Sequence, residues 1–344
     1  FVFWELTSVT SYLLIGNDDE KPQARAAARS AILITGMGGL VMLAGIVLIG
    51  QSAGTYLLSD LVAAPPSGTT VAVGAALVLV GAFTKSAQYP FGGWLPGAMV
   101  APTPISTYLH AATMVKAGVF LVARLAPILA AVDTWQPLVL TVPSVTMIVG
   151  AWRALRQHDL KLLLAYGTVS QLGFLMLLFG TGEYAVAQAG IVLLIAHALF
   201  KAALFMVVGI IDHEVGTRDV RRLAGFGAGW WPVTVTAVLA AASMAGVPPM
   251  LGFIAKEKAL DALLGASFGG SVAVVVVVVV GSILTFAYSS RFVLGVLGRL
   301  HVPDADEPAS SPTVHAPSPA FVAPAALLAV ASVAFGLAPV IVSD

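Results

Sequence analysis

Cysteine is absent from the chain, and charged residues fill only 10% of its 344 positions. Without thiols the chain can form neither disulfide bonds nor thiolate metal sites. A soluble domain carries roughly 25% charged residues, so the shortage of charge and the mean hydropathy of +0.95 exclude an ordinary globular protein. Basic and acidic residues number 17 each, which argues against nucleic-acid binding. P-loop, dinucleotide-binding, H-E-x-x-H and Ser-His-Asp patterns are also missing, so no enzyme signature is present.

Long apolar segments take the place of these features. Most are about 20 residues long, the length that an α-helix needs to cross roughly 30 Å of hydrocarbon, whereas barrel strands would alternate over about 10. We therefore predict an all-α integral membrane protein. Its ten predicted crossings are residues 1–16, 30–50, 70–96, 103–125, 136–156, 160–179, 185–211, 232–260, 268–291 and 320–341. Phe1 opens inside an apolar segment without a signal-peptide layout, so we expect further residues before it.

The basic residues of the loops test this count. Eleven fall in alternate loops and one, Arg124, on the other side, which is the asymmetry that the positive-inside rule predicts. The basic loops are therefore expected in the cytoplasm, and Phe1 outside. The eleven are Lys21, Arg25, Arg29, Arg153, Arg156, Lys161, Arg218, Arg221, Arg222, Arg291 and Arg299.

Two crossings contain helix breakers beside a lysine. Lys85 closes an apolar run and is followed by Pro90, Gly92 and Gly93, and the segment 246–252, GVPPMLG, precedes Lys256. In a bilayer, broken backbone survives only where protein or a water-filled cavity satisfies its polar groups, and a buried lysine is expensive unless it has a function or a partner. Both breaks are therefore candidate points on an ion path.

The two broken segments are the third and eighth crossings, five apart. An odd offset means that the second unit enters the membrane from the opposite side, which is the inverted-repeat plan of many transporters. We predict two inverted five-helix repeats in a fragment of a longer subunit. Residues 1–125 would be the last four helices of the first repeat and 136–291 the second, followed by a flexible cytoplasmic loop at 292–319 and an additional transmembrane helix at 320–344.

Several long motifs resemble the antiporter module of the Mrp-type multisubunit sodium/proton antiporters, as found in their large A-type component, and its relatives, the proton-pumping membrane subunits of respiratory complex I. The matching runs are FWELTS at 3–8, TKSAQYPFGGWLPGAM at 84–99, APTPIS at 101–106, HAATMVKAGVFL at 110–121, HALFKAALFMVVGIIDHEVGTRD at 197–219 and SMAGVPPMLGFIAKE at 243–257. The resemblance covers nearly the whole chain and implies the same helical fold.

It also implies a function. We expect a proton-translocating subunit of a multisubunit sodium/proton antiporter in the cell membrane, a transporter and not an enzyme, without cofactor or metal. Its expected partners are small membrane subunits, a second antiporter-like subunit, protons, Na⁺ and lipid. Two alternatives stay open: a proton-pumping subunit of complex I or a related hydrogenase, and a non-conducting scaffold. Complex I subunits commonly have an uncharged residue at the position of Lys116, which favours the antiporters.

Lys85 is the first candidate proton carrier, because a buried lysine can load and release protons near neutral pH. The resemblance implies that Glu5 pairs with it. A static ion pair between two helices, or a lysine that snorkels to the interface, is the alternative. His110 and Lys116 follow in the fourth crossing, about 120° apart on a regular helix, where they could line one path. His110 could instead be a hydrogen-bonded helix contact.

His197 and Lys201 are spaced i,i+4, so they share a helix face and their titrations should be coupled. A metal site is unfavoured because this pair supplies only one good ligand. Lys256 matches the terminal lysine of the family, and Glu257 is its possible partner. The alternative for Glu257 is an interfacial charge. Lys258 is read as a snorkelling residue, and Asp212 and His213 belong to an accessory interfacial network with Arg218 and Asp219.

Sodium prefers several oxygen ligands, usually with a carboxylate. Only Glu5 and Glu257 are plausible acids inside the predicted crossings, and each has a lysine beside it. We therefore expect the cation path to lie outside this segment.

Overall fold

The computed structural model describes residues 1–302 and 315–338, and within these ranges the chain is helical, with one isolated β-bridge between Asp159 and Asp219. The α-helices are α1 (Val2–Ile15), α2 (Pro22–Ala53), α3 (Leu58–Ala63), α4 (Thr69–Lys85), α5 (Trp94–Gly97), α6 (Thr103–Thr107), α7 (Ala117–Leu129), α8 (Trp135–Leu155), α9 (Leu160–Gly180), α10 (Tyr184–Val215), α11 (Trp231–Ala245), α12 (Leu251–Leu264), α13 (Ser271–Val296) and α14 (Pro319–Leu337). Short 3₁₀ or π turns are η1 (Phe91–Gly93), η2 (Ala98–Val100), η3 (Tyr108–Ala112), η4 (Met114–Lys116) and η5 (Ala228–Trp230).

All ten predicted crossings correspond to helical segments. Among the described residues, seven spans are long and apolar enough to cross a membrane. The other three predicted crossings correspond to the shorter apolar helices α1, α4 and α11. Of these, α4 and α11 are the first halves of the two broken segments. The prediction of an all-α integral membrane protein is confirmed.

The first break begins where α4 ends, at Lys85. Ala87 adopts a left-handed conformation with φ 51°, and the Tyr89–Pro90 bond is cis. The chain then continues through η1, α5 and η2, and Trp94 Nε1 donates a hydrogen bond to the Thr84 carbonyl oxygen at 2.9 Å. The same carbonyl oxygen also accepts a long hydrogen bond from the backbone N–H of Ala87, at 3.4 Å, so the Trp94 side chain adds a second, shorter bond at the end of the interrupted helix. The proline and glycines therefore break the helix where the sequence predicts it.

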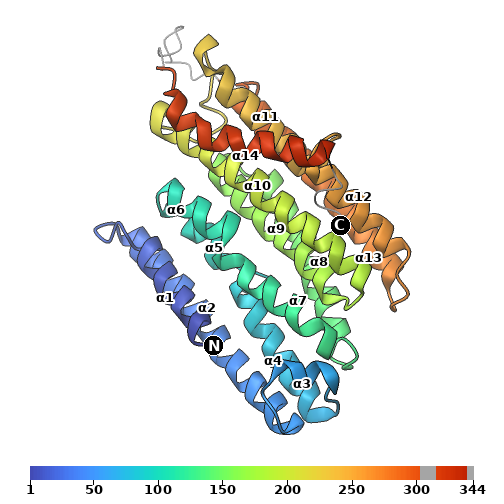
Figure 1. Ribbon diagram of the computed structural model, residues 1–344. Coiled ribbons are helices and arrows are strands. Elements are labelled where there is room, and N and C mark those ends of the chain that lie inside the picture. Colours follow the sequence, from blue (N-terminus) through green and yellow to red (C-terminus); the bar gives the residue numbers. More distant parts are fainter. Residues whose placement is uncertain (303–314, 339–344) are drawn as a thin grey trace.

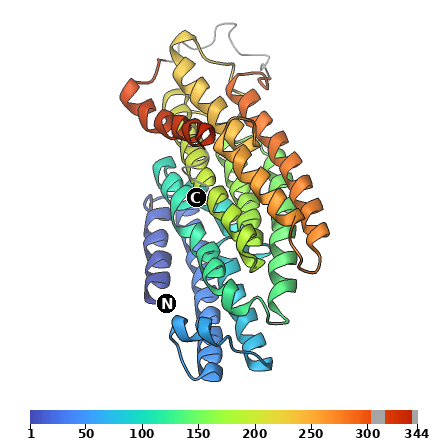
Figure 2. The same ribbon diagram turned by 45° about the vertical axis from the view of Figure 1, so that its right-hand side comes forward.

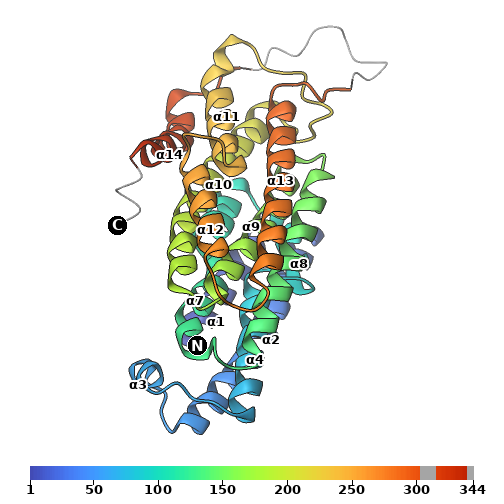
Figure 3. The same ribbon diagram turned by 90° about the vertical axis from the view of Figure 1, so that its right-hand side faces the viewer.

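The second break separates α11 from α12. Gly246 ends α11 in a left-handed conformation with φ 83°, and the Pro248–Pro249 bond is cis. Figure 3 shows α12 following α11 along the same side of the molecule, with α13 next to them. Both predicted breaks are confirmed.

The fourth crossing is a third irregular segment, which the sequence did not predict. Between α6 and α7 the chain forms the π turn η3, then Thr113 with φ −120° and ψ −91°, then the 3₁₀ turn η4. The expected regular helix over 103–125 is therefore wrong. The angle of about 120° between His110 and Lys116 does not apply, because a π turn and a 3₁₀ turn lie between the two residues.

Helices α9 and α10 form the centre of the bundle. In its apolar window α9 is 89% buried, more than any other span described. The N-terminal helices α1 to α4 lie along one side, and α8 and α11 to α13 lie on the other (Figures 1 and 2). Helix α14 contacts α10, α11 and α12 and crosses them at an angle. The buried interior therefore surrounds α9 and α10, which carry several candidate residues.

The C-terminal boundaries differ in part from the prediction. Helix α13 continues to Val296, beyond the expected end at 291, so the start of the predicted flexible loop is helical. Residues 303–314 of that loop, and 339–344 at the end of the predicted last helix, lie outside the described residues. The division of the chain into repeats, loop and extra helix stays a prediction.

Candidate functional site

Lys85 reaches from the end of α4 to α1. Its side chain is fully buried, and Nζ donates hydrogen bonds to the Trp4 carbonyl oxygen at 3.0 Å and to Ser8 Oγ at 2.6 Å. Nζ also lies 5.0 Å from the centre of the Trp4 ring, within cation–π range. The polar groups of α1 thus hold the ammonium where the first helix breaks.

Glu5 lies on the same turn of α1. It is partly buried, and its charge acts on Lys85. The ion pairs within 4.0 Å among the described residues do not include these two side chains. Glu5 and Lys85 therefore interact through charge at longer range, without the contact of a direct salt bridge.

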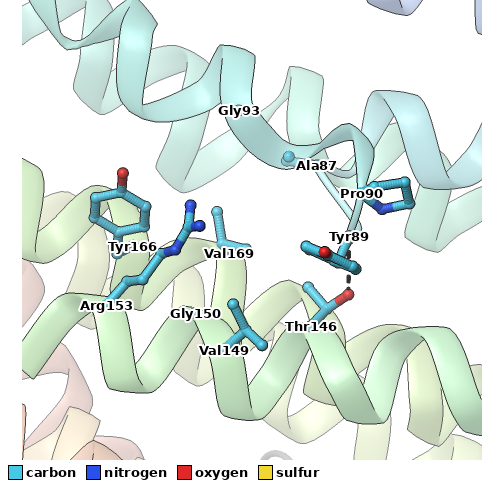
Figure 4. A pocket seen from close by; sticks show the side chains of 11 residues that line it. Ala87, Tyr89, Pro90, Gly93, Thr146, Val149, Gly150, Arg153, Tyr166 and Val169 are labelled. Carbon is cyan, nitrogen blue, oxygen red and sulfur yellow. Dashed lines mark hydrogen bonds between the residues drawn. The ribbon is translucent and has the colours of Figure 1, made fainter.

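A cavity of about 150 Å³ adjoins the first break, between residues 87–93 and helices α8 and α9. Figure 4 shows Arg153 and Tyr166 at one end of it and Tyr89, Pro90 and Thr146 at the other. The backbone N–H of Tyr89 donates to Thr146 Oγ1 at 2.9 Å. Lys85 does not line this cavity, so the cavity reaches the broken backbone and not the ammonium.

His110 and Lys116 lie in the irregular fourth crossing. His110 is fully buried between Trp94, at a ring-centroid distance of 6.4 Å, and Phe205, at 6.3 Å. Lys116 is 9% exposed. Neither Lys116 Nζ nor either ring nitrogen of His110 has a hydrogen-bond partner within the described part of the chain. The two side chains are close enough for the charge of Lys116 to act on His110.

His197 and Lys201 occupy successive turns of α10, and both are fully buried. Lys201 Nζ donates to the Leu164 carbonyl oxygen of α9 at 3.0 Å. The charge of Lys116 acts on both residues. The structure therefore brings the fourth and seventh crossings close together. A relay of protons through these residues stays a prediction.

Lys161 lies near His110, and its burial was not predicted, because the sequence analysis counted it among the residues of a basic loop. It lies in the first turn of α9 and is 1% exposed, and its Nζ donates to the Ala101 carbonyl oxygen at 2.5 Å. Its charge acts on His110. Asp159 caps α9 by accepting hydrogen bonds from the backbone N–H groups of Lys161 and Leu162. The predicted crossing 160–179 already contains Lys161, but no local signal in the sequence shows that its side chain faces the interior.

A second missed group lies between α9 and α13. A Cβ atom added at Gly167 would lie 3.0 Å from Lys201 Nζ and 3.1 Å from Tyr288 Cε2, so the lysine and the tyrosine approach each other across this glycine. Tyr288 is fully buried, and one turn before it Thr285 accepts a hydrogen bond from Gln171 Nε2 at 3.3 Å. Single polar residues in apolar helices gave no periodic signal that could have found this cluster.

Lys256 lies just after the second break and is 8% exposed. Its Nζ donates to the Ala245 carbonyl oxygen at 2.8 Å, which satisfies a carbonyl at the end of α11. Glu257 is exposed and forms no ion pair with Lys256 among the described residues. The structure therefore fits the alternative of an interfacial charge for Glu257 better than that of a partner for Lys256.

Two of the accessory residues, Asp212 and Arg218, form an ion network with Asp159 at the end of α10. Arg218 contacts Asp159 at 3.2 Å and Asp212 at 3.3 Å. His213 is exposed and lies edge-on to Phe321, with ring centroids 5.5 Å apart. Asp212 and His213 also line a largely apolar cavity of about 760 Å³ between α6, η3, α10 and α14. The network joins two loops and α10. Its interfacial role stays a prediction.

Asp219 and Arg221 form a second pair beside it. Arg221 Nη2 lies 2.6 Å from Asp219 Oδ2. The side-chain hydrogen bond from Arg221 is the main cause that lowers the pKa of Asp219 from 3.8 to about 2. Within residues 1–302 and 315–338, no cluster of three or more His, Asp or Glu side chains suited to a metal ion occurs.

Known proteins show which family the chain belongs to. The model of the family described as NADH:quinone oxidoreductase/Mrp antiporter, TM, matches residues 1–285. The chain belongs to this family. It is similar to the A/B subunit of a probable K⁺/H⁺ antiporter of Rhizobium meliloti, with 44% identity over 98% of this chain and 34% of the relative. It is also similar to the A1 subunit of the Na⁺/H⁺ antiporter of Staphylococcus saprophyticus, with 40% identity over 100% of this chain and 45% of the relative.

Solved structures give the same result. A chain of the Mrp complex from Dietzia sp. is 42% identical, with a TM-score of 0.87 over 98% of this chain and 36% of the other. A chain of the archaeal membrane-bound sulfane sulfur reductase, at 24% identity and a TM-score of 0.86, shares the fold. The resemblance to A-type antiporter subunits is confirmed, and the chain spans between a third and a half of the length of these curated relatives.

Proposed function

We propose that this chain is the proton-conducting section of an A-type component in a multisubunit monovalent cation/proton antiporter. It would act as a secondary transporter and not as an enzyme, in the cell membrane, with its basic loops in the cytoplasm and other antiporter subunits as partners. Membership of the antiporter family supports this proposal, and so do the relatives that are named as A-type parts of Na⁺/H⁺ antiporters.

The observation that carries the proposal is the central group of five buried basic residues. They come from three segments, namely the fourth crossing, α9 and α10, and include three side chains whose nitrogen atoms have no hydrogen-bond partner among the described residues. A static core would leave such groups at a large energetic cost. Proton transfer through bound water gives them a function. The five are His110, Lys116, Lys161, His197 and Lys201.

The two outer lysines connect to this group through their neighbours. Ser86, next to Lys85, donates a hydrogen bond to the carbonyl oxygen of Val115, next to Lys116, at 2.7 Å. Helix α12, which carries Lys256, packs against α10. We therefore place the proton path from Glu5 and Lys85, through the central group, to Lys256, with Asp212, His213 and Glu257 outside it.

The transported cation is a separate question. The relatives are named for both K⁺ and Na⁺ exchange. Glu257 is exposed, and the carboxylate of Glu5 interacts electrostatically with Lys85. These placements support our expectation that the cation ligands lie in other parts of the protein or in partner subunits.

The alternatives receive less support. A complex I or hydrogenase subunit would share the family and the fold, but residue 116 is a buried lysine here, which favours the antiporter branch. A non-conducting scaffold would have no function for the five buried basic residues of the central group. Quinone-linked or iron–sulfur subunits in the purified complex would favour the first alternative, and small antiporter subunits favour our proposal.

The test is cation-driven proton movement in inverted membrane vesicles, followed with a pH-sensitive dye. Lys201→Met should reduce exchange by at least about tenfold, a change of about 1.4 kcal/mol in the barrier. Lys258→Met is the matched control, since Lys258 lies on α12 and is only partly buried, and it should exchange normally. Near-normal exchange by Lys201→Met at equal protein levels would contradict the proposal.

A further inference from the structure

The carboxylate of Glu5 lies directly on the backbone of α2. A Cβ atom added at Gly39 would come closer than 3.0 Å to Glu5 Oε1, 3.0 Å from Glu5 Cδ and 3.3 Å from Trp4 Cδ1. Oε1 is buried and has no hydrogen-bond partner among the described residues. The position of the carboxylate thus depends on the absence of a side chain at residue 39.

This dependence differs from ordinary close packing of helices. Small residues commonly let two backbones approach in a membrane. At Gly39, however, the nearest atom is the end of a flexible side chain, so alanine would displace the carboxylate and could leave the helices in place. Alanine is also the better helix former. Substitution at this position should therefore move a charge without unfolding the protein.

We infer that Gly39 is a positioning residue for Glu5. Because Gly39 has no side chain, the Glu5 carboxylate can lie against α2, apart from the Lys85 ammonium, which is hydrogen-bonded to Trp4 and Ser8 of α1. This inference rests on the proposed function, because it assigns Gly39 a part in proton exchange at Lys85. The separation leaves the two charges in interaction without a contact pair, so the lysine can release its proton while the carboxylate stays in place.

Few other charges can act on Glu5. Helix α4 contributes Lys85, which is bonded to α1, and η4, which also packs against α1, contributes Lys116. Helix α2 carries Arg25 and Arg29, both near its N-terminal end. Residues of α2 around Gly39 are uncharged. Displacement of the Glu5 carboxylate would therefore act mainly on the proton exchange of Lys85.

The experiment compares Gly39→Ala with Gly36→Ala in the assembled complex, in inverted vesicles across a range of pH. Gly36 lies on the same helix, and a Cβ atom there would meet nothing within 4 Å. Gly39→Ala should lower exchange several-fold and shift its pH profile by more than about half a unit, whereas Gly36→Ala should behave as the unmodified protein. Equal yield of assembled complex checks folding.

Rescue distinguishes positioning from packing. Glu5→Asp shortens the side chain by one methylene and makes room for a methyl at residue 39. The double variant should therefore exchange faster than Gly39→Ala alone, a coupling that independent sites do not show. Absence of rescue would overturn the inference and leave Gly39 as a packing residue.

A spectroscopic readout separates this inference from the proposed function. The pH-induced infrared difference signal of the Glu5 carboxyl is identified by its loss in Glu5→Gln. That signal should change in Gly39→Ala and not in Gly36→Ala, whether or not the vesicles exchange ions. Normal exchange by both Glu5→Gln and Lys85→Met would refute the proton path at this point, whereas an unchanged infrared signal in Gly39→Ala would refute the positioning role alone.

Discussion

Replacing Lys85 by methionine should abolish exchange without destabilising the protein. Methionine keeps most of the length and volume of the side chain but removes the ammonium. The two hydrogen bonds to Trp4 and Ser8 are lost with it. Lys85 therefore stabilises the fold through its two hydrogen bonds and destabilises it through the burial of its ammonium, and these two free energies can be compared.

The magnitudes favour the variant. A buried acceptor left without a partner costs about 1–3 kcal/mol, and here the loss is smaller because Ser8 Oγ already donates to the Trp4 carbonyl oxygen at 3.4 Å. Burial of an ammonium costs several kcal/mol even after relaxation. Loss of the counter-charge also acts on Glu5, but Glu5 is only partly buried and makes no contact ion pair with Lys85, so this cost is smaller. We expect the thermal stability of Lys85→Met to equal or exceed that of the unmodified protein.

Two measurements on the same preparation check this expectation. Melting in detergent, followed by size-exclusion chromatography after heating, gives the stability, and dye-monitored exchange in vesicles gives the function. Lys258→Met serves as the control for loss of one lysine. Near-normal exchange by Lys85→Met would refute the role of Lys85 as a carrier, and a large drop in melting temperature would refute our comparison of the two energies.

Three further outcomes are expected. Lys161→Met should reduce exchange although the residue lies at a helix end, and vesicle assays with wild-type activity would show that this lysine is only structural. Gly118→Ala should lower the melting temperature, because its methyl group would overlap the Ala82 carbonyl oxygen, and overpacking costs about 1–3 kcal/mol; an unchanged melting temperature would contradict this. Arg221→Ala should return the pKa of Asp219 from about 2 toward 3.8. Since a lowered carboxyl pKa stabilises the fold above about pH 4 and this contribution disappears toward pH 2, the melting temperatures of this variant and the unmodified protein should differ most above pH 4 and converge in acid; a difference that does not vary with pH would contradict it.

The two predicted helix breaks could be read from the sequence because proline and glycine act locally. Pro90 removes a backbone donor wherever it stands, and Gly246 accepts a left-handed conformation that other residues avoid. The irregular segment around Thr113 carries no such residue. His110 in this segment packs between Trp94 and Phe205, and such contacts between residues far apart in the chain follow no local rule.

The depth of Lys161 could not be predicted for a related reason. Loop charge indicates the side of the membrane on which a helix begins, but not the direction in which a residue of the first turn faces. That direction is set by the Ala101 carbonyl oxygen, sixty residues earlier in the chain. His197 and Lys201, in contrast, were predictable as a pair because one helix fixes their relation.

The loops at one end of the second half are joined by backbone hydrogen bonds. Leu160 donates to Arg218, Val220 to His158 and Val302 to Arg221, at 2.8–3.0 Å. These bonds join the start of α9 to the segment after α10, and that segment to the one after α13. Some carriers expose their site to each side of the membrane in turn by a movement of helices. Movement of α9, α10 and α13 relative to one another would have to break these three hydrogen bonds. The proton path that we propose would therefore operate here through side-chain rotation and changes in hydration, between helices that keep their relative positions at this end.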